Sequence, residues 1–348
     1  MTLLEQLDLK HPIFLAPMAG ITTPQLAAEV ANAGGLGALG LGASTPAQAL
    51  KQILATQALT DRSFQVNFFC HQSVELDPQL EHAWLEYMQP FFAHYSTTAP
   101  KHLSCLYPSF LDHDDYLRVV LETRPKAVSF HFGLPHPRQI QALKAAGIIT
   151  MVSATNLVEA RAIEAAGIDV IIAQGIEAGG HRGMFNPQLD SAITTKDLVQ
   201  LITANSNLPV VAAGGIMHGS HAAKMLNLGA SAVQMGTAFI QCKSSNASAS
   251  YREALFKQPI TQITHSISGR PARGLINAWH SQVDQAERPP VPPYPYAYDL
   301  AKQLQHVATE QQDQRFCAFW AGTRVAQIRA LEPADLINLL MLEMKLPK

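Results

Sequence analysis

Charged side chains are scarce in this 348-residue chain, and their scarcity excludes several classes of protein. Only 15% of the residues are charged, with 25 basic and 27 acidic side chains and no basic run, so we expect no surface for nucleic acid or an anionic membrane. No stretch reaches the roughly 18 apolar residues of a membrane span. Glu5 and Asp8 lie where a signal peptide is positively charged, so a cytoplasmic location is expected.

Cysteines are also few, and their spacing matches no known motif. The four are scattered without a CxxC pair or another metal-ligand arrangement, at Cys70, Cys105, Cys242 and Cys317. Such scattering favours buried, reduced thiols over disulfides or a zinc site. Hydrophobic residues make up 47% of the chain, which is enough for a large core.

Glycines repeatedly separate helical patterns from short apolar runs. Four helix-like segments end at a glycine suited to the left-handed position after a helix, at Gly34, Gly147, Gly167 and Gly229. Thr23-Pro24 and Thr45-Pro46 are typical helix starts. The apolar runs predict eight strands, near residues 13–18, 36–40, 64–69, 127–132, 149–154, 170–175, 209–214 and 232–237. This alternation predicts an α/β protein with the (β/α)8 barrel of the TIM type.

The chain exceeds the roughly 250 residues of a lone barrel, so a smaller appended region is expected. We assign residues 1–240 to the barrel and residues 241–320 to a mostly helical cap over one barrel mouth. Residues 321–348 are expected to pack on the barrel and to contain an amphipathic helix over 333–345. The segment 70–126 is too long for one strand–helix unit. Within it, residues 102–107 (HLSCLY) compete with the eight runs for a place among the strands.

Polar residues and glycines gather at the predicted carboxyl ends of the strands, the face that carries catalytic groups in this fold. They are Met18, Asn67, Ser129, His131, Ser153, Gln174, Gly214, Gly215, Gln234, Met235, Gly236 and Thr237. The late glycines and the Thr237 hydroxyl predict a phosphate site, because glycine lets backbone amides approach an anion. A tight turn alone would also explain Gly214 and Gly215. Asn67, alone among apolar neighbours, needs a hydrogen-bond partner, either a backbone group or a ligand such as the edge of a flavin.

The loop after the sixth strand is rich in glycine and polar residues. It reads QGIEAGGHRGMF over residues 174–185, a composition that no core strand requires. His181 is its candidate proton-transfer group, since imidazole titrates near neutral pH. His131 is a second histidine at a strand end, either a packed structural side chain or a site residue. Arg182 is expected to be exposed at a helix start, with charge balance in the site as the alternative.

These motifs resemble class I nitronate monooxygenase, formerly called 2-nitropropane dioxygenase, over nearly the whole chain. The resemblance is carried by PMAGITTPQLAAEVANAGGLGALG (17–40), VNFF (66–69), SFHFGLP (129–135), AQGIEAGGHRG (173–183), AAGGI (212–216), QMGTAF (234–239), SGRPARGLIN (268–277) and FWAG (319–322). It implies an FMN cofactor held by Met18, Asn67, Gln174, Gly179, Gly180, Gly214, Gly215, Gln234, Met235, Gly236 and Thr237. It also implies His181 as the active-site base, with His131, Tyr294 and Tyr298 near the substrate. Which tyrosine of residues 294–298 faces the ligand stays open.

The resemblance further implies a reaction. An anionic nitronate, such as propionate 3-nitronate, would bind against the flavin and give up an electron to form a flavin semiquinone, and O2 would complete conversion to a carbonyl compound and nitrite. The alternative is an NAD(P)H-dependent FMN reductase on the same barrel, an enoyl-acyl carrier protein reductase or a quinone reductase. A flavin-binding barrel without turnover and a phosphate-binding aldolase or isomerase are further alternatives. A monomer or homodimer is expected.

Overall fold

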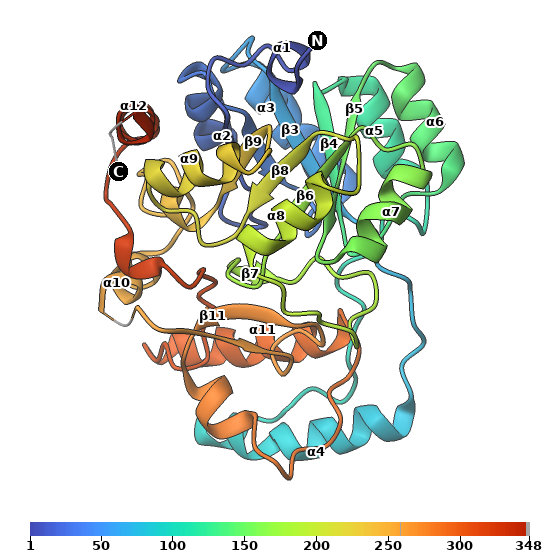
Figure 1. Cartoon of the computed structure of the whole chain (residues 1–348). Coiled ribbons are helices and arrows are strands. Elements are labelled where there is room, and N and C mark those ends of the chain that lie inside the picture. The colour runs from blue at the N-terminus through green and yellow to red at the C-terminus, as the bar shows by residue number, and fades with distance from the viewer. Residues whose placement is uncertain (258, 346–348) are drawn as a thin grey trace.

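Eight parallel strands form the barrel that the sequence predicts (Figure 1). This computed structural model describes residues 1–257 and 259–345. The strands are β1 (Ile13–Leu15), β2 (Gly37–Gly40), β3 (Phe64–Phe69), β4 (Ala127–His131), β5 (Ile149–Ala154), β6 (Val170–Gln174), β8 (Val210–Ala213) and β9 (Ala232–Met235). Leu36 joins β2 to β1 through two backbone hydrogen bonds of 2.9 Å, with Ile13 and Leu15, and so closes the barrel. All eight predicted strands are confirmed, and residues 102–107 form no strand.

Helices surround the barrel in the predicted alternation. They are α2 (Pro24–Asn32), α3 (Pro46–Gln57), α5 (Asp115–Thr123), α6 (Pro137–Ala145), α7 (Leu157–Ala165), α8 (Thr195–Thr203) and α9 (Gly219–Asn227). The hydroxyl groups of Thr23 and Thr45 cap α2 and α3, and a proline follows each cap. The glycines predicted to end helices have positive φ angles, for example +74° at Gly147 and +76° at Gly167.

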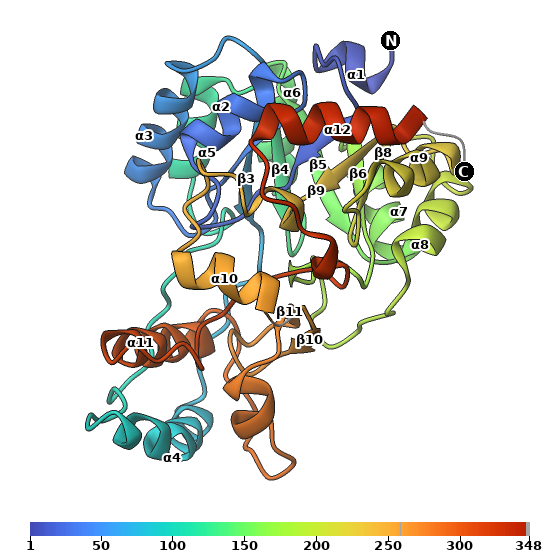
Figure 2. The same ribbon diagram turned by 90° about the vertical axis from the view of Figure 1, so that its left-hand side faces the viewer.

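Two terminal segments complete the barrel. The short helix α1 (Leu3–Gln6) precedes β1, and Leu3 and Leu7 belong to the apolar cluster inside the barrel. The last helix, α12 (Pro333–Lys345), lies across the outside of the barrel and packs against both α2 and α9 (Figure 2). It therefore takes the place of the eighth barrel helix, although residues 236–332 separate it from β9.

A second hydrophobic core lies in the cap below the carboxyl ends of the strands (Figure 1). The cap contains α10 (Ala249–Lys257), β10 (Thr261–Thr264), β11 (Ala272–Leu275), the π-helix η2 (Trp279–Val283), α11 (Tyr296–Glu310) and α4 (Pro78–His94). The buried residues of its core come from α4, η2, α11 and the loops beside them. The short 3-10 helix η1 (Thr237–Phe239) follows β9, and η3 (Val325–Gln327) precedes α12. Trp84 and Met88 of α4 pack with Trp279 and Leu300, so α4 leaves the barrel and joins residues far along the chain. The short strand β7 (Gly180–His181) pairs with β11 and ties the barrel to the cap.

Two further expectations concern the surface and the thiols. No helix in the described ranges is both long and apolar enough to cross a membrane. All four cysteines are free, and Cys70, Cys242 and Cys317 are buried as expected. Cys105 is exposed instead, because it belongs to the irregular segment that follows α4 and runs along the surface.

Candidate active site

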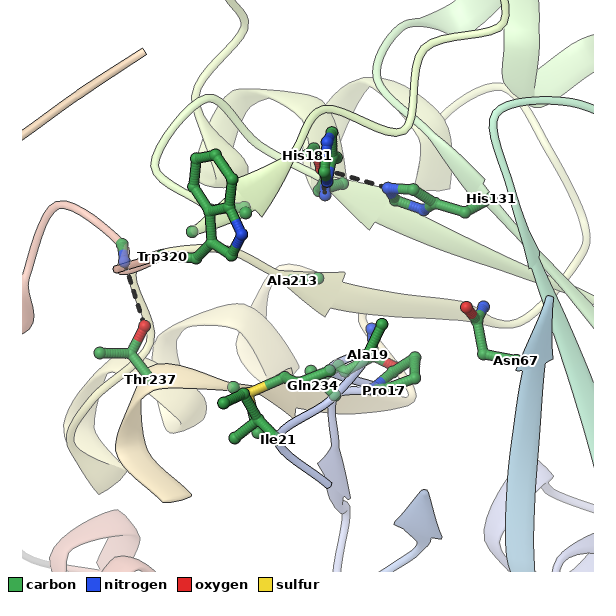
Figure 3. Close-up of a pocket in the computed structure, with 18 of the residues that line it drawn as sticks. Pro17, Ala19, Ile21, Asn67, His131, His181, Ala213, Gln234, Thr237 and Trp320 are labelled. Atoms are coloured by element: carbon green, nitrogen blue, oxygen red, sulfur yellow. Dashed lines mark hydrogen bonds between the residues drawn. The ribbon is translucent and has the colours of Figure 1, made fainter. Parts of the chain in front are cut away.

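Every residue proposed from the sequence for the site lies around one pocket between the barrel and the cap (Figure 3). The barrel side contributes Met18, Asn67, His131, Gln174, Gly179, Gly180, His181, Gly214, Gly215, Gln234, Met235, Gly236 and Thr237, and the cap contributes Tyr294 and Tyr298. The structure adds residues that we did not single out, among them Tyr107, Trp320 and Arg324. The pocket therefore has a wall of strand ends and a wall of aromatic cap residues.

His181 is held at the junction of these walls. Its strand, β7, pairs with β11, and the neighbouring Arg182 N–H donates to the Pro271 carbonyl over 2.8 Å. The Nε2 atom of the His181 ring lies 2.8 Å from the Ser268 hydroxyl. The ring centroids of Trp320 and Tyr294 lie 5.4 Å and 5.8 Å from that of His181. The SGRPARGLIN segment thus positions the histidine of the EAGGHRG loop.

The surroundings of His181 keep its imidazole uncharged. Burial, together with His131 and the Arg270 guanidinium, lowers the pKa of His181 to about 3. Above that pH the ring has one nitrogen lone pair available. A neutral imidazole can accept a proton from a bound molecule or donate one hydrogen bond to it.

Both ring nitrogens of His131 are bonded within the protein. Nε2 lies 3.1 Å from the His181 backbone carbonyl, which is an acceptor only, so Nε2 carries the proton (Figure 3). Nδ1 then accepts from the Ser153 hydroxyl over 3.0 Å. Burial lowers the pKa of His131 to about 4. His131 lines the pocket, but its hydrogen bonds support the His181 backbone.

Gln174 and Arg182 both anchor the loop of residues 174–185, and the expected exposure of Arg182 is wrong. Arg182 is completely buried, not exposed at a helix start. Its guanidinium forms a bidentate salt bridge with Asp190. It also donates to the Gln174 and Gly175 carbonyls, over 3.1 and 2.7 Å. The Gln174 side chain donates to the His181 carbonyl and accepts from the Gly183 N–H. The loop folds back on the end of β6 because these carbonyls need donors.

One corner of the pocket is formed almost entirely by backbone. Gly214 and Gly215 have φ angles of +121° and +63°, which side chains rarely adopt. The amide N–H groups of Gly179 and Gly215 donate to no acceptor within the described residues. A Cβ atom placed on Gly322 would lie 3.4 Å and 3.8 Å from these two nitrogens, so the three backbones converge.

The same corner carries a hydroxyl and a charge. The Gly322 N–H donates to the Thr237 hydroxyl over 3.0 Å, which leaves the hydroxyl proton free for a ligand (Figure 3). Arg324 lines the pocket and donates to the Gly215 carbonyl. Free amides, a hydroxyl and a guanidinium are the groups that bind a phosphate.

The opposite end of the pocket is rich in amides. Figure 3 shows Asn67 across the pocket from Thr237. The Asn67 side chain donates to the backbone carbonyl and the hydroxyl of Ser129, over 3.1 and 3.0 Å. Gln65, which is completely buried, donates to the Gln234 side chain over 3.3 Å. Asn67 and Gln234 are thus fixed in orientation beside the pocket.

The cap wall is aromatic and positively charged. Tyr294 is buried, and its hydroxyl has no hydrogen-bond partner in the described structure. Lys302 lies over the rings of Tyr107 and Tyr298, 5.4 Å from each centroid. Tyr294 and Tyr298 both line the pocket, whereas Tyr296 does not, so two of the three tyrosines in residues 294–298 stay candidates for contact with a ligand. A buried hydroxyl without a hydrogen-bond partner, in a pocket that a lysine also lines, suits an anionic ligand.

Comparison with known proteins decides the family. Residues 1–343 match the sequence profile described as nitronate monooxygenase. The nitronate monooxygenase of Pseudomonas aeruginosa is 48% identical over 343 residues, 97% of each chain. The chain belongs to the nitronate monooxygenase family. The nitronate monooxygenase of Paraburkholderia phytofirmans is 46% identical over 99% of this chain and 94% of that protein.

Solved structures agree with this membership. A nitroalkane oxidase from Streptomyces ansochromogenes superposes with a TM-score of 0.88 at 36% identity, covering 97% of this chain and 96% of that one. FabK from Thermotoga maritima gives a TM-score of 0.75 at 29% identity, covering 99% and 95%. Membership of the nitronate monooxygenase family makes the chain an oxidoreductase of a flavin-dependent family, and it confirms the resemblance seen in the sequence.

Proposed function

We propose that this protein is an FMN-dependent nitronate monooxygenase. It oxidises alkyl nitronates, propionate 3-nitronate among them, with O2 to carbonyl compounds and nitrite. The observation that carries the proposal is the pocket itself, in which a phosphate-binding corner and a neutral, buried histidine face the same space. A barrel that only bound phosphate would not need the aromatic wall around His181.

The pocket residues fit FMN. Gly179, Gly215, Thr237 and Arg324 would hold a single phosphate, since they offer free amides, a hydroxyl and a positive charge. At the far end, Met18, Asn67, Gln174 and Gln234 would border the ring system. When bound, FMN supplies the capacity to accept electrons from the substrate and pass them to O2.

The protein binds and orients the substrate. The unpartnered Tyr294 hydroxyl donates a hydrogen bond to a nitronate oxygen, and Lys302 attracts an anion to the pocket. The aromatic wall of Tyr298 and Trp320 excludes water from the space beside His181. Because a nitronate has already lost its α-proton, His181 borders this anion without acting as a base on it. With a neutral nitroalkane, His181 removes the α-proton.

An anaerobic mixing experiment separates this function from the flavin reductase alternative. The FMN-loaded protein is mixed in a stopped-flow instrument with NADH, with NADPH and with an alkyl nitronate, and flavin absorbance is followed. We expect the nitronate to change the flavin spectrum within the time of one turnover and the nicotinamides to leave it unchanged. Rapid bleaching by NADH or NADPH, with no response to nitronate, would establish the reductase instead.

A further inference from the structure

Ser268 contacts the His181 ring and is not among the residues that line the pocket. Its side chain is completely buried, and its hydroxyl oxygen lies 2.8 Å from the Nε2 atom of His181. No carboxylate of the described chain lies within hydrogen-bond distance of the His181 ring. This histidine is therefore oriented by a hydroxyl group, which can either donate or accept, so the direction of one hydrogen bond decides which ring nitrogen carries the proton.

The bonds around the Ser268 hydroxyl determine that direction. A hydroxyl has one proton to donate and two lone pairs to accept with. The Ser268 hydroxyl lies 3.1 Å from the Arg270 carbonyl, which can only accept, and the Arg270 N–H donates back to it over 3.3 Å. If the single proton goes to the carbonyl, the remaining lone pair accepts from His181 Nε2–H, and every group is satisfied. If the proton went to His181, the buried Arg270 carbonyl would lose this bond.

We propose that Ser268 is a positioning residue that keeps the proton of His181 on Nε2 and leaves the Nδ1 lone pair directed to the substrate pocket. The inference rests on the proposed function for its chemical meaning, since only a free lone pair can remove an α-proton. In the opposite tautomer, Nδ1–H would face the substrate as a hydrogen-bond donor, and His181 would not be a base.

The segment around Ser268 is built to hold the hydroxyl in place. Gly269 has a φ of +82°, and a Cβ there would lie 2.4 Å from the Pro292 carbonyl and 2.6 Å from the Tyr294 nitrogen. The turn is therefore pressed against the backbone that carries Tyr294. The Arg270 guanidinium lies 4.3 Å above the Phe132 ring and donates to the Met184 carbonyl over 2.8 Å. Ser268 thus has a fixed distance to His181 and to the aromatic wall.

The tautomer can be measured directly. The protein is labelled with nitrogen-15 histidine, and long-range proton–nitrogen correlations are recorded at neutral pH with FMN bound. The signals of His181, one of 14 histidines, are assigned by their absence in H181N. We expect a protonated Nε2 and an unprotonated Nδ1. A protonated Nδ1 would overturn the proposal whatever reaction the enzyme catalyses, so this result is independent of the proposed function.

Two variants test whether Ser268 is the cause. In S268A we expect the His181 nitrogen shifts to move towards a mixture of tautomers. We also expect turnover of a neutral nitroalkane, which needs the base, to fall by about 10- to 100-fold, as on loss of the partner that orients a metal-bound histidine. The matched control is S266A, because Ser266 is equally buried in the same segment but donates to Asp284. S266A should leave the His181 nitrogen shifts and the rate of turnover unchanged. Unchanged His181 shifts in S268A, or an equal loss in both variants, would contradict the proposal.

Discussion

Replacing Arg182 with methionine tests how the active-site loop is held. The substitution keeps most of the apolar stem and removes the guanidinium, which is completely buried and makes bonds to Asp190 and to the Gln174 and Gly175 carbonyls. Removing one partner of a buried ion pair costs about 3–5 kcal/mol. The Asp190 side chain is 23% exposed, so water offsets part of its loss. We therefore expect the free energy of unfolding to fall by about 3 kcal/mol, the lower end of this range.

Urea unfolding followed by circular dichroism measures this change, and two controls interpret it. Arg138→Met removes a surface ion pair with Asp114, in which the two side chains are 60% and 42% exposed, and should leave the free energy of unfolding nearly unchanged. The double variant Arg182→Met/Asp190→Asn should recover part of the stability, because no unpaired carboxylate remains. If Arg182→Met costs no more than Arg138→Met, the guanidinium does not hold the loop.

Three further predictions concern the cofactor, the base and acid stability. Gly215→Val should weaken FMN binding by at least about tenfold, or 1.4 kcal/mol. The control is Gly167→Val, which also places a side chain at a positive φ (+76°) but outside the pocket, and which should keep the flavin. Equal flavin content in both variants would refute the phosphate site. His181→Asn should lower nitroalkane oxidation by about 100- to 10,000-fold and nitronate oxidation by less, and an equal loss on both would exclude a base. Burial lowers the pKa values of His71 and His131 to about 4, so these histidines bind protons more readily in the unfolded chain than in the folded chain. Their contribution to the free energy of unfolding should be fully present above about pH 6.5 and should fall towards pH 4, by up to about 1.4 kcal/mol per pH unit for each histidine. A free energy of urea unfolding that stays constant between these pH values would contradict the burial of the two side chains.

The barrel could be predicted because its signals are local. Each strand is a short apolar run, and each helix end is marked by a residue whose conformation depends on its neighbours, such as the caps at Thr23 and Thr45 and the glycines at 147 and 167. In a (β/α)8 barrel the carboxyl ends of all eight strands lie on one face, so the residues around the pocket could be predicted from the sequence.

Features that depend on distant partners could not be predicted. In the sequence Arg182 resembles a surface arginine, because its partners Asp190 and the two carbonyls are identified only by the fold. The pairing of β7 with β11 joins residues about 90 positions apart, and a two-residue strand has no periodicity of its own. Tyr107 lines the pocket from the segment that the sequence could not place, and FWAG identified Trp320 only as part of a motif.

The release of nitrite from a nitronate tests the central proposal most directly. The FMN-loaded protein is incubated with propionate 3-nitronate and, separately, with an alkyl nitronate, in air and under anaerobic conditions, and nitrite and dissolved oxygen are measured over time. The proposed function predicts continuous nitrite release in air, accompanied by oxygen consumption, and at most one enzyme equivalent of turnover without oxygen. No nitrite above the rate of the free nitronate in buffer would contradict it, even if the protein binds FMN.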